Sequence, residues 1–227
     1  MRVDHRRARS VRVTEIFHSI QGESTWAGLP CTFVRLTGCP LRCVWCDTAY
    51  AFHGGDRMDI GEVLDAVRAH GCRLVEITGG EPLVQPGAAT LAAVLLDEGC
   101  TVLVETSGAL DIGVLDPRVH RIMDLKCPGS GEEHRNLWSN LDHLTRRDEV
   151  KFVVAGLEDF DWAVGAIRRH GLDERVRDGS LGALLISPVW GLNGLEALAA
   201  RILASGLPVR FQTQLHKHIW GPDRAGV

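Results

Sequence analysis

CPLRCVWCDT, residues 39–48, is the stretch around which the rest of the chain is interpreted. It places three cysteines, Cys39, Cys43 and Cys46, at C-x3-C-x2-C spacing within eight residues. A structural zinc site normally has four protein ligands, and no fourth ligand lies close by in the sequence. Three thiolates on one loop instead suit a cubane iron–sulfur cluster in which one iron keeps an open position. An open metal position can bind a substrate or a cofactor directly.

Enzymes of the radical S-adenosylmethionine (SAM) superfamily carry the same cysteine spacing, and residues 39–48 resemble their signature closely. The resemblance implies a 4Fe–4S cluster on the three cysteines, with SAM bound at the open iron. It also implies that an electron from the cluster cleaves SAM and yields a 5′-deoxyadenosyl radical. A zinc knuckle and a redox-active cysteine pair are the alternatives for this motif.

Length and composition are those of one globular domain. The chain has 227 residues, of which 45% are hydrophobic and 24% charged, with a net charge of −4. It has no overall basic excess of the kind that binds nucleic acid or an anionic membrane, and no apolar run long enough to cross a membrane. Residues 1–10 contain four arginines and no apolar stretch, so we expect a disordered basic tail rather than a signal peptide. A single domain over residues 11–227 should follow.

The other four cysteines are not expected to form a site. Seven cysteines without a secretory signal argue against a disulfide framework and for a reducing cytoplasm. Cys31, Cys72 and Cys100 each lie beside a strand-like run, so we interpret them as small buried hydrophobic residues. Cys127 follows a predicted strand and could face a site, but we expect it to be a bystander.

Strand-like and helix-like segments alternate along the chain. The first strand should cover residues 11–17 and be followed by a polar loop over 18–24. Further strands are expected at 31–36, 73–78, 101–106, 120–126, 149–154, 183–187 and 209–214. Helices are expected at 59–67 with Asp59 as N-cap, and at 86–98, 133–144, 159–170 and 195–205.

This alternation predicts an α/β fold with a mostly parallel sheet. Because the chain is short for a complete eight-unit barrel, we expect an incomplete TIM-like barrel of about six βα units with an open edge. Ligands of such folds bind at the carboxyl ends of the strands. Glycine, serine and charged residues gather at these ends here, as in TGGE at 78–81 and TS at 106–107.

Four further segments narrow the resemblance within the superfamily. They are FHSIQGE at 17–23, FVRLTGC at 33–39, ITGGEP at 77–82 and FQTQLHK at 211–217. Together they resemble the 7-carboxy-7-deazaguanine synthase family. A glycyl-radical-enzyme activating protein would share the cluster and the Gly-Gly-Glu-Pro element, and is the alternative enzyme. A zinc-binding interaction module is the alternative that is not an enzyme.

The family resemblance implies a reaction and a set of partners. The substrate would be 6-carboxy-5,6,7,8-tetrahydropterin, converted with loss of ammonia to 7-carboxy-7-deazaguanine in queuosine and 7-deazapurine biosynthesis. It implies SAM, the 4Fe–4S cluster and Mg²⁺ as cofactors, a flavodoxin-like reductant and a homodimer. No nucleic acid or membrane partner is expected.

The resemblance also assigns residues to the substrate and to Mg²⁺. A carboxylate in a dry pocket needs a cationic fork, and Arg35 suits this role, the alternative being a salt bridge to a nearby carboxylate. Thr48 resembles a Mg²⁺ ligand, although such a threonine is by default a turn residue. The remaining substrate contacts would be Ile20, Gln21, Gly22, Glu23, Thr78 and His216.

The resemblance places SAM near the ends of the strands. Glycine would let backbone carbonyls approach the methionine amino group of SAM closely. Simple capping and turn chemistry is the alternative for several of these positions. The residues that resemble SAM contacts are Asp47, Gly80, Glu81, Ser107, Lys126, Asn136 and Ser187.

Overall fold

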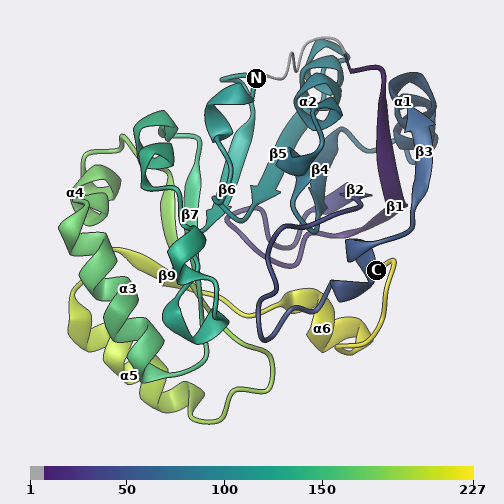
Figure 1. The fold of residues 1–227 in the computed structure, drawn as a ribbon. Coiled ribbons are helices and arrows are strands. Elements are labelled where there is room, and N and C mark those ends of the chain that lie inside the picture. The colour runs from purple at the N-terminus through teal and green to yellow at the C-terminus, as the bar shows by residue number, and fades with distance from the viewer. Residues whose placement is uncertain (1–7) are drawn as a thin grey trace.

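A nine-stranded sheet runs through residues 8–227, the part of the chain that the computed structural model describes (Figure 1). Its strand order is β3-β1-β2-β4-β5-β6-β7-β8-β9. The strands are β1 (Ser10–Ile20), β2 (Pro30–Leu36), β3 (Asp56–Asp59), β4 (Leu74–Gly79), β5 (Thr101–Thr106), β6 (His120–Asp124), β7 (Glu149–Val154), β8 (Ala183–Pro188) and β9 (Val209–Phe211).

The sheet is the predicted incomplete barrel. From β2 to β9, six successive pairings are parallel, whereas β1 pairs antiparallel with both β2 and β3. Helices α1 and α2 pack beside the strands from β1 to β5, and α3, α4 and α5 beside β7, β8 and β9 (Figure 1). The helices are α1 (Ile60–Ala69), α2 (Gly87–Asp97), α3 (Leu157–Arg169), α4 (Leu172–Arg177), α5 (Leu195–Ser205) and α6 (Leu215–Trp220).

Local signals explain the helices that were predicted well. Helix α1 begins after Asp59, whose backbone N–H donates to the Glu62 carboxylate at 2.7 Å, completing a capping box. It buries Ile60, Val63 and Val67, one face of the helix. Helix α5 ends before Gly206, which has a left-handed φ of 65°.

Residues 133–144, predicted to be one helix, form two short 3₁₀ segments instead, Glu133–Arg135 and Trp138–His143. Two asparagine side chains hold this region in other hydrogen bonds. Asn136 bonds to both backbone groups of Lys126, and Asn140 donates to two carbonyls of the loop after β5. Side chains of this type compete with a helix for backbone partners.

The ends of the chain differ in smaller ways from the predictions. Strand β1 continues to Ile20, which pairs with Pro30, so the polar loop begins later than expected. Strand β9 ends at Phe211, and the short edge strand β3 was not anticipated. The predicted tail falls mostly on residues 1–7, outside the described part, and β1 already begins at Ser10. Within residues 8–227, no helix has both the length and the apolar character needed to cross a membrane.

The two faces of the parallel strands differ in chemistry. Toward the helices the strands bury apolar side chains such as Ile77, Val104 and Phe152. Toward the inside of the barrel they present polar and charged ones, which line a cavity: Glu76, Thr78, Glu105, Asp124 and Lys151. A sheet buried on both faces normally carries apolar side chains on both. The polar inner face therefore marks the site.

Candidate active site

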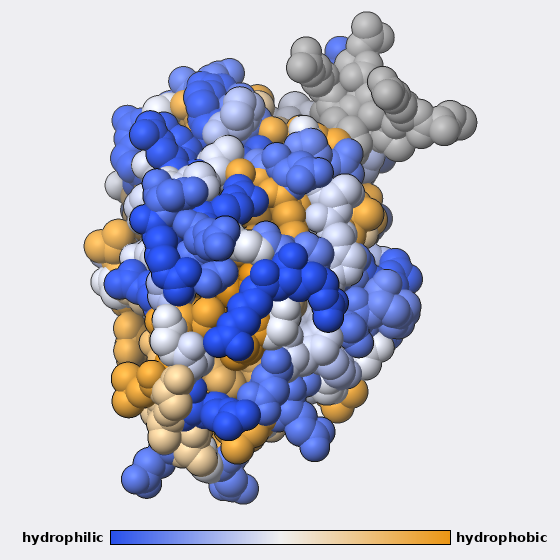
Figure 2. All heavy atoms as spheres, turned by 90° about the vertical axis from the view of Figure 1, so that its left-hand side faces the viewer, coloured by the Kyte–Doolittle hydropathy of each residue, from blue (hydrophilic) through white to orange (hydrophobic). Residues whose placement is uncertain are grey.

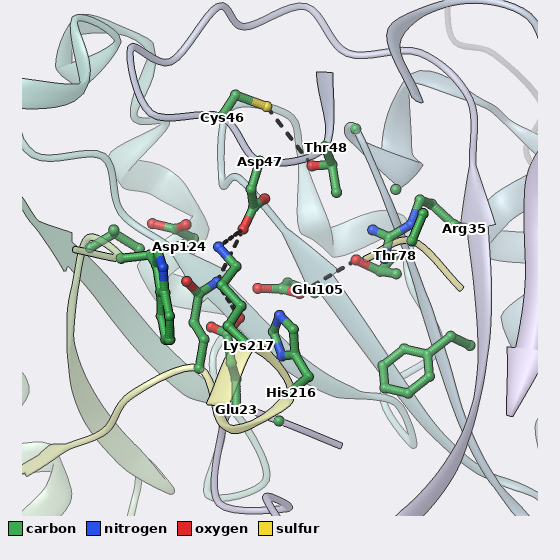
Figure 3. A pocket seen from close by; sticks show the side chains of 18 of the residues that line it. Glu23, Arg35, Cys46, Asp47, Thr48, Thr78, Glu105, Asp124, His216 and Lys217 are labelled. Carbon is green, nitrogen blue, oxygen red and sulfur yellow. Dashed lines mark hydrogen bonds and ion pairs between the residues drawn. The ribbon is translucent and has the colours of Figure 1, made fainter. Parts of the chain in front are cut away.

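One cavity of about 710 Å³ occupies the inside of the barrel. The cysteine loop, the loop after β1, the inner face of the strands and α6 all contribute to its lining (Figure 3). All residues predicted to contact the substrate line it, as do the three motif cysteines and Thr48. Of the predicted SAM contacts, Asp47, Gly80, Ser107 and Lys126 line it, and Glu81, Asn136 and Ser187 do not.

The cysteine loop is braced from both sides. The Arg42 guanidinium lies 4.2 Å from the centre of the Phe52 ring and donates to the Cys39 carbonyl at 2.9 Å. On the other side, the backbone N–H of Glu81 donates to the Gly38 carbonyl at 2.8 Å. A side chain on Gly80 would collide with Gly38 and Cys39, so only glycine permits this approach.

The three thiols fit a cluster better than a single ion. Cys39, Cys43 and Cys46 are unbonded to other cysteines, partly buried and open to the cavity. Within residues 8–227, no three His, Cys, Asp or Glu side chains converge closely enough to hold one metal ion. The corners of an iron–sulfur cluster are more widely spaced than the ligands of one zinc ion. Burial raises the pKa of Cys43 to about 11, and a bound metal would favour its thiolate form.

Glu81, predicted as a SAM contact, is fully buried and points away from the cavity. Its carboxylate accepts hydrogen bonds from the Leu83 and Ser107 backbone N–H groups, at 3.0 and 2.6 Å, and from the Thr106 hydroxyl at 2.9 Å. It therefore ties the end of β4 to the end of β5. Gly79 and Gly80, which precede it in the sequence, line the cavity, whereas Glu81 does not.

The side chains of Asn136 and Ser187 also hydrogen-bond to neighbouring residues and do not line the cavity. The Asn136 amide brackets the Lys126 backbone, accepting from its N–H and donating to its carbonyl, both at 2.9 Å. The Ser187 hydroxyl accepts a hydrogen bond from the Gln212 amide at 2.9 Å. A contact between SAM and these three side chains stays a prediction.

The loop after β1 forms the floor of the cavity. Strand β1 is antiparallel, so Ile20 lies at the opposite end of the sheet from the ends of the parallel strands, and the loop then turns beneath the cavity. The Gln21 amide is buried, donates to the Glu76 carboxylate and accepts from the Glu23 backbone N–H at 2.7 Å. Gln21 therefore holds the floor in place, and the Glu23 carboxylate faces the cavity.

Lys151 is the centre of the charged inner face. Its side chain is 5% exposed, and its ammonium donates to the Glu105 carboxylate and, at 3.0 Å, to Glu23. The Glu105 carboxylate also accepts from the Thr78 hydroxyl at 3.4 Å. Burial, together with the carboxylates of Glu105 and Glu23, raises the pKa of Glu76 well above its usual value. Together these charged side chains form one wall of the cavity.

Sequence analysis missed most of this wall, although the signal was present. Charged residues inside otherwise apolar parallel strands are unexpected unless they serve a site. The lysines are a second signal: the chain has only three, Lys126, Lys151 and Lys217, and all three line the cavity. Arginine supplies the positive charge elsewhere on the protein.

Arg35 forms the salt bridge considered as the alternative, and its contact with the substrate stays a prediction. Its Nε donates to Glu15 at 2.7 Å. The Tyr50 hydroxyl donates to the same carboxylate oxygen at 2.8 Å, and the guanidinium lies over the rings of Phe17 and Tyr50. Within residues 8–227, the two terminal nitrogens of Arg35 have no hydrogen-bond partner. A fork of N–H donors therefore remains free to face the cavity.

His216 and Lys217 bring the end of the chain to the site. Burial lowers the pKa of His216, so its imidazole is neutral at pH 7. Lys217 donates to the Asp47 carboxylate at 2.6 Å, and the Gln214 amide donates to the same oxygen at 3.1 Å (Figure 3). Burial acts to raise the pKa of Asp47, but Lys217 and Gln214 outweigh it and lower the pKa to about 2.

Comparisons with known proteins agree with this geometry. The family model of the radical SAM superfamily matches residues 33–128. A 7-carboxy-7-deazaguanine synthase of Chlorobaculum tepidum is 44% identical over 96% of this chain and 97% of its own length. The enzymes of the same name from Koribacter versatilis and Thermoplasma acidophilum are 40% and 39% identical, over 96% and 95% of this chain and 100% and 99% of their own lengths.

A solved structure supports the fold. The crystal structure of QueE from Escherichia coli superposes with a TM-score of 0.74, covering 91% of this chain and 95% of that one at 22% identity. The sequence relatives support an assignment to a specific family, since their similarity extends over nearly the whole chain. By this similarity the chain belongs to the 7-carboxy-7-deazaguanine synthase family, within the radical SAM superfamily.

Proposed function

We propose that this protein converts 6-carboxy-5,6,7,8-tetrahydropterin to 7-carboxy-7-deazaguanine, releasing ammonia. One observation carries the proposal: the three motif cysteines and the free guanidinium fork of Arg35 open into the same cavity. A reaction started at an iron–sulfur cluster can thus reach a small carboxylated substrate. An activating protein for a glycyl-radical enzyme would need access for a polypeptide instead.

The chain's own residues would position the substrate and exclude side reactions. The 4Fe–4S cluster, held by the three cysteines, and SAM supply one-electron chemistry at a carbon–hydrogen bond when bound. Arg35 would receive the substrate carboxylate, and Glu23 on the floor would accept hydrogen bonds from the N–H groups of the pterin. The neutral His216, packed over Gly22, would close the floor on that side.

The proposal is tested by supplying the reconstituted protein with the tetrahydropterin, SAM and dithionite under anaerobic conditions. We expect a deazapurine product, identified by its ultraviolet spectrum and mass. Cleavage of SAM without any deazapurine would favour the activating protein. Uptake of one zinc ion, without iron or sulfide, would favour the interaction module.

Arg35→Lys should raise the KM for the tetrahydropterin while leaving reductive SAM cleavage intact. Lysine keeps the charge but loses the fork, and a charge-assisted hydrogen bond is worth about 1.5–3 kcal/mol, so KM should rise roughly 10-fold to 100-fold. Steady-state kinetics check the change. Arg201→Lys, at an exposed pair with Asp161, is the control and should behave as wild type. An unchanged KM in Arg35→Lys would remove the role assigned to Arg35.

Mg²⁺ is proposed as a further cofactor, with Thr48 as its protein ligand. The Thr48 hydroxyl lies 3.8 Å from the Cys46 sulfur and lines the cavity, so an ion there would lie between the cluster loop and the substrate. Mg²⁺ prefers oxygen ligands and keeps several waters, so one hydroxyl suffices on the protein side.

Thr48→Val should reduce the stimulation of product formation by Mg²⁺, since valine preserves the shape but removes the oxygen ligand. The measurement is the Mg²⁺ concentration that gives half-maximal rate, which should rise about tenfold for a weakened ligand set. Iron content should not change. If wild type and Thr48→Val respond equally to added Mg²⁺, the ion is not bound here.

The partners expected from the family remain part of this proposal. A flavodoxin-like protein would reduce the cluster, and the exposed Val44 beside Cys43 offers a contact near it. Homodimer formation is supported by exposed apolar side chains near the open edge of the sheet, namely Leu195, Leu203 and Phe211 (Figure 2 shows the face with α3, α4 and α5). Free thiols throughout residues 8–227 support a cytoplasmic location.

A further inference from the structure

Helix α6 contacts two parts of the site that are far apart in the sequence. At its start, the Leu215 backbone N–H donates to the Gly22 carbonyl at 2.9 Å, and the Gln214 amide donates to Glu23 at 3.0 Å. These bonds attach it to the floor of the cavity. One turn later Lys217 reaches the cysteine loop at Asp47, the residue after Cys46 (Figure 3).

The contact between α6 and the floor of the cavity is tightly packed. A side chain at Gly22 would overlap the His216 ring and would lie 3.0 Å from the His216 backbone nitrogen. Glycine thus lets the backbone of α6 lie directly against the floor. The floor and the backbone of α6 are therefore in direct contact.

The contact with the cysteine loop is an ion pair between the buried Lys217 and Asp47, whose side chain is 41% exposed. Lys217 is 7% exposed, and its only ion pair within residues 8–227 is with Asp47. A buried ammonium is costly unless it is paired, so Lys217 holds Asp47 firmly. Gln214 donates to both Glu23 and Asp47, which makes the path from floor to loop continuous.

The path also reaches the inner face of the sheet. Glu23 accepts from Lys151, which in turn bonds to Glu105. The hydrogen-bonded chain thus runs from β5 and β7 through the floor and α6 to the loop that carries the cluster cysteines. Networks of this kind can transmit a change between two sites when both ends are held.

We propose that Lys217 is a positioning residue that couples the substrate-binding floor to the cysteine loop through α6 and Asp47. The inference rests on the proposed function and deepens it. With the pair intact, binding of the tetrahydropterin on the floor orders residues 39–48 as well. Without it, only Gln214 still links the floor to the loop, so the coupling weakens and more SAM is cleaved without a correctly placed substrate.

The test compares Lys217→Met, which keeps the length but removes the charge, with Lys217→Arg, which restores it. The first measurement is hydrogen–deuterium exchange in residues 39–48 of the anaerobic holoenzyme with SAM, with and without the tetrahydropterin. Substrate should slow exchange about tenfold in wild type and in Lys217→Arg, and by less than twofold in Lys217→Met. Arg201→Met, which breaks an exposed ion pair on α5, should match wild type.

The second measurement is the amount of 5′-deoxyadenosine released per deazapurine formed. This ratio should rise about tenfold in Lys217→Met, which corresponds to the loss of one charge-assisted hydrogen bond. Iron content should stay at the wild-type level, because all three cysteines are retained. If Lys217→Met does not fold, Gln214→Met, which breaks the same path at an uncharged residue, takes its place.

Wild-type exchange behaviour and a wild-type ratio in Lys217→Met would overturn the coupling. Failure of the proposed function would look different, since wild-type protein itself would then form no deazapurine. In that case the exchange measurement with SAM alone still decides whether Lys217 holds the cysteine loop: faster exchange of residues 39–48 in Lys217→Met than in wild type supports the role, and equal exchange overturns it.

Discussion

Replacing Cys46 with serine is expected to remove the iron–sulfur cluster and to reduce deazapurine formation to background. The motif supplies three thiolates, and within residues 8–227 no other cysteine lines the cavity. A serine hydroxyl ionises far less readily than a thiol, and iron in such clusters is held by thiolates. Iron and acid-labile sulfide per chain, measured after anaerobic reconstitution, check the prediction directly.

A matched control exists in the same chain. Cys100 is another free, partly buried cysteine, but it follows α2 and lies outside the cavity. Cys100→Ser should therefore keep its full iron content and activity. Full iron content in Cys46→Ser, or loss of iron in Cys100→Ser, would contradict the assignment of the cluster to residues 39–48.

The sheet could be predicted well because its strands are locally encoded. Strands β5 and β7 have the predicted bounds, and α5 begins and ends where predicted, closed by Gly206. Apolar runs bounded by glycine or polar residues are sufficient signals for buried parallel strands. The region at 133–144 failed because Asn136 and Asn140 bond to backbone groups elsewhere in the chain, which no local pattern reveals.

The motifs predicted several residues that line the cavity. The motif cysteines, the floor residues and Arg35 all line one cavity, although they come from different parts of the sequence. The direction in which a side chain points could not be predicted from these motifs. Glu81 belongs to a recognisable motif, yet its carboxylate points into the protein to tie β4 to β5. Motifs identify positions, whereas tertiary contacts decide which atoms face the cavity.

The charged wall around Lys151 shows what could not be predicted from the sequence. Its partners Glu23 and Glu105 lie 128 and 46 residues away in the sequence. Pairing over such separations follows from the strand order, which brings β5 and β7 to either side of β6. Sequence analysis could have noted a lysine inside an apolar strand, but could not have named its partners.

This wall leads to the second large prediction: Lys151→Met should destabilise the protein and weaken tetrahydropterin binding. Breaking a buried ion pair by removing one partner costs about 3–5 kcal/mol. Solvent reaches 17% of the Glu23 side chain and 28% of Glu105, so we expect the low end, about 3 kcal/mol. For a chain of this length, that lowers Tm by roughly 10 °C. Thermal unfolding at pH 8 measures it.

The pH dependence distinguishes this mechanism from lost packing. Burial acts to lower the pKa of Lys151, but the carboxylates of Glu105 and Glu23 outweigh burial and raise this pKa well above its usual value. The stabilisation from the Lys151 charge is therefore complete below the pKa of lysine in the unfolded chain, and it is lost as pH rises through the pKa in the folded protein. Burial acts to raise the pKa of Glu23, but Lys151 and Gln214 outweigh it and lower it. Its stabilisation is present above the unfolded pKa and is lost as pH falls through the folded one. The pair therefore stabilises the fold between about pH 4.3 and 10.4, the unperturbed values of the two groups.

In Lys151→Met the cation is gone, and burial now raises the pKa of Glu23. The folded variant then binds a proton more tightly than the unfolded chain, so its stability increases as pH falls. The difference in unfolding free energy between wild type and Lys151→Met should consequently be smaller at pH 5 than at pH 8. Leu185→Met, a buried residue on neighbouring β8, is the control for packing and should show a difference that does not vary with pH. A constant difference in Lys151→Met would mean that the lysine contributes by packing alone, and that the carboxylates of the wall do not depend on its charge.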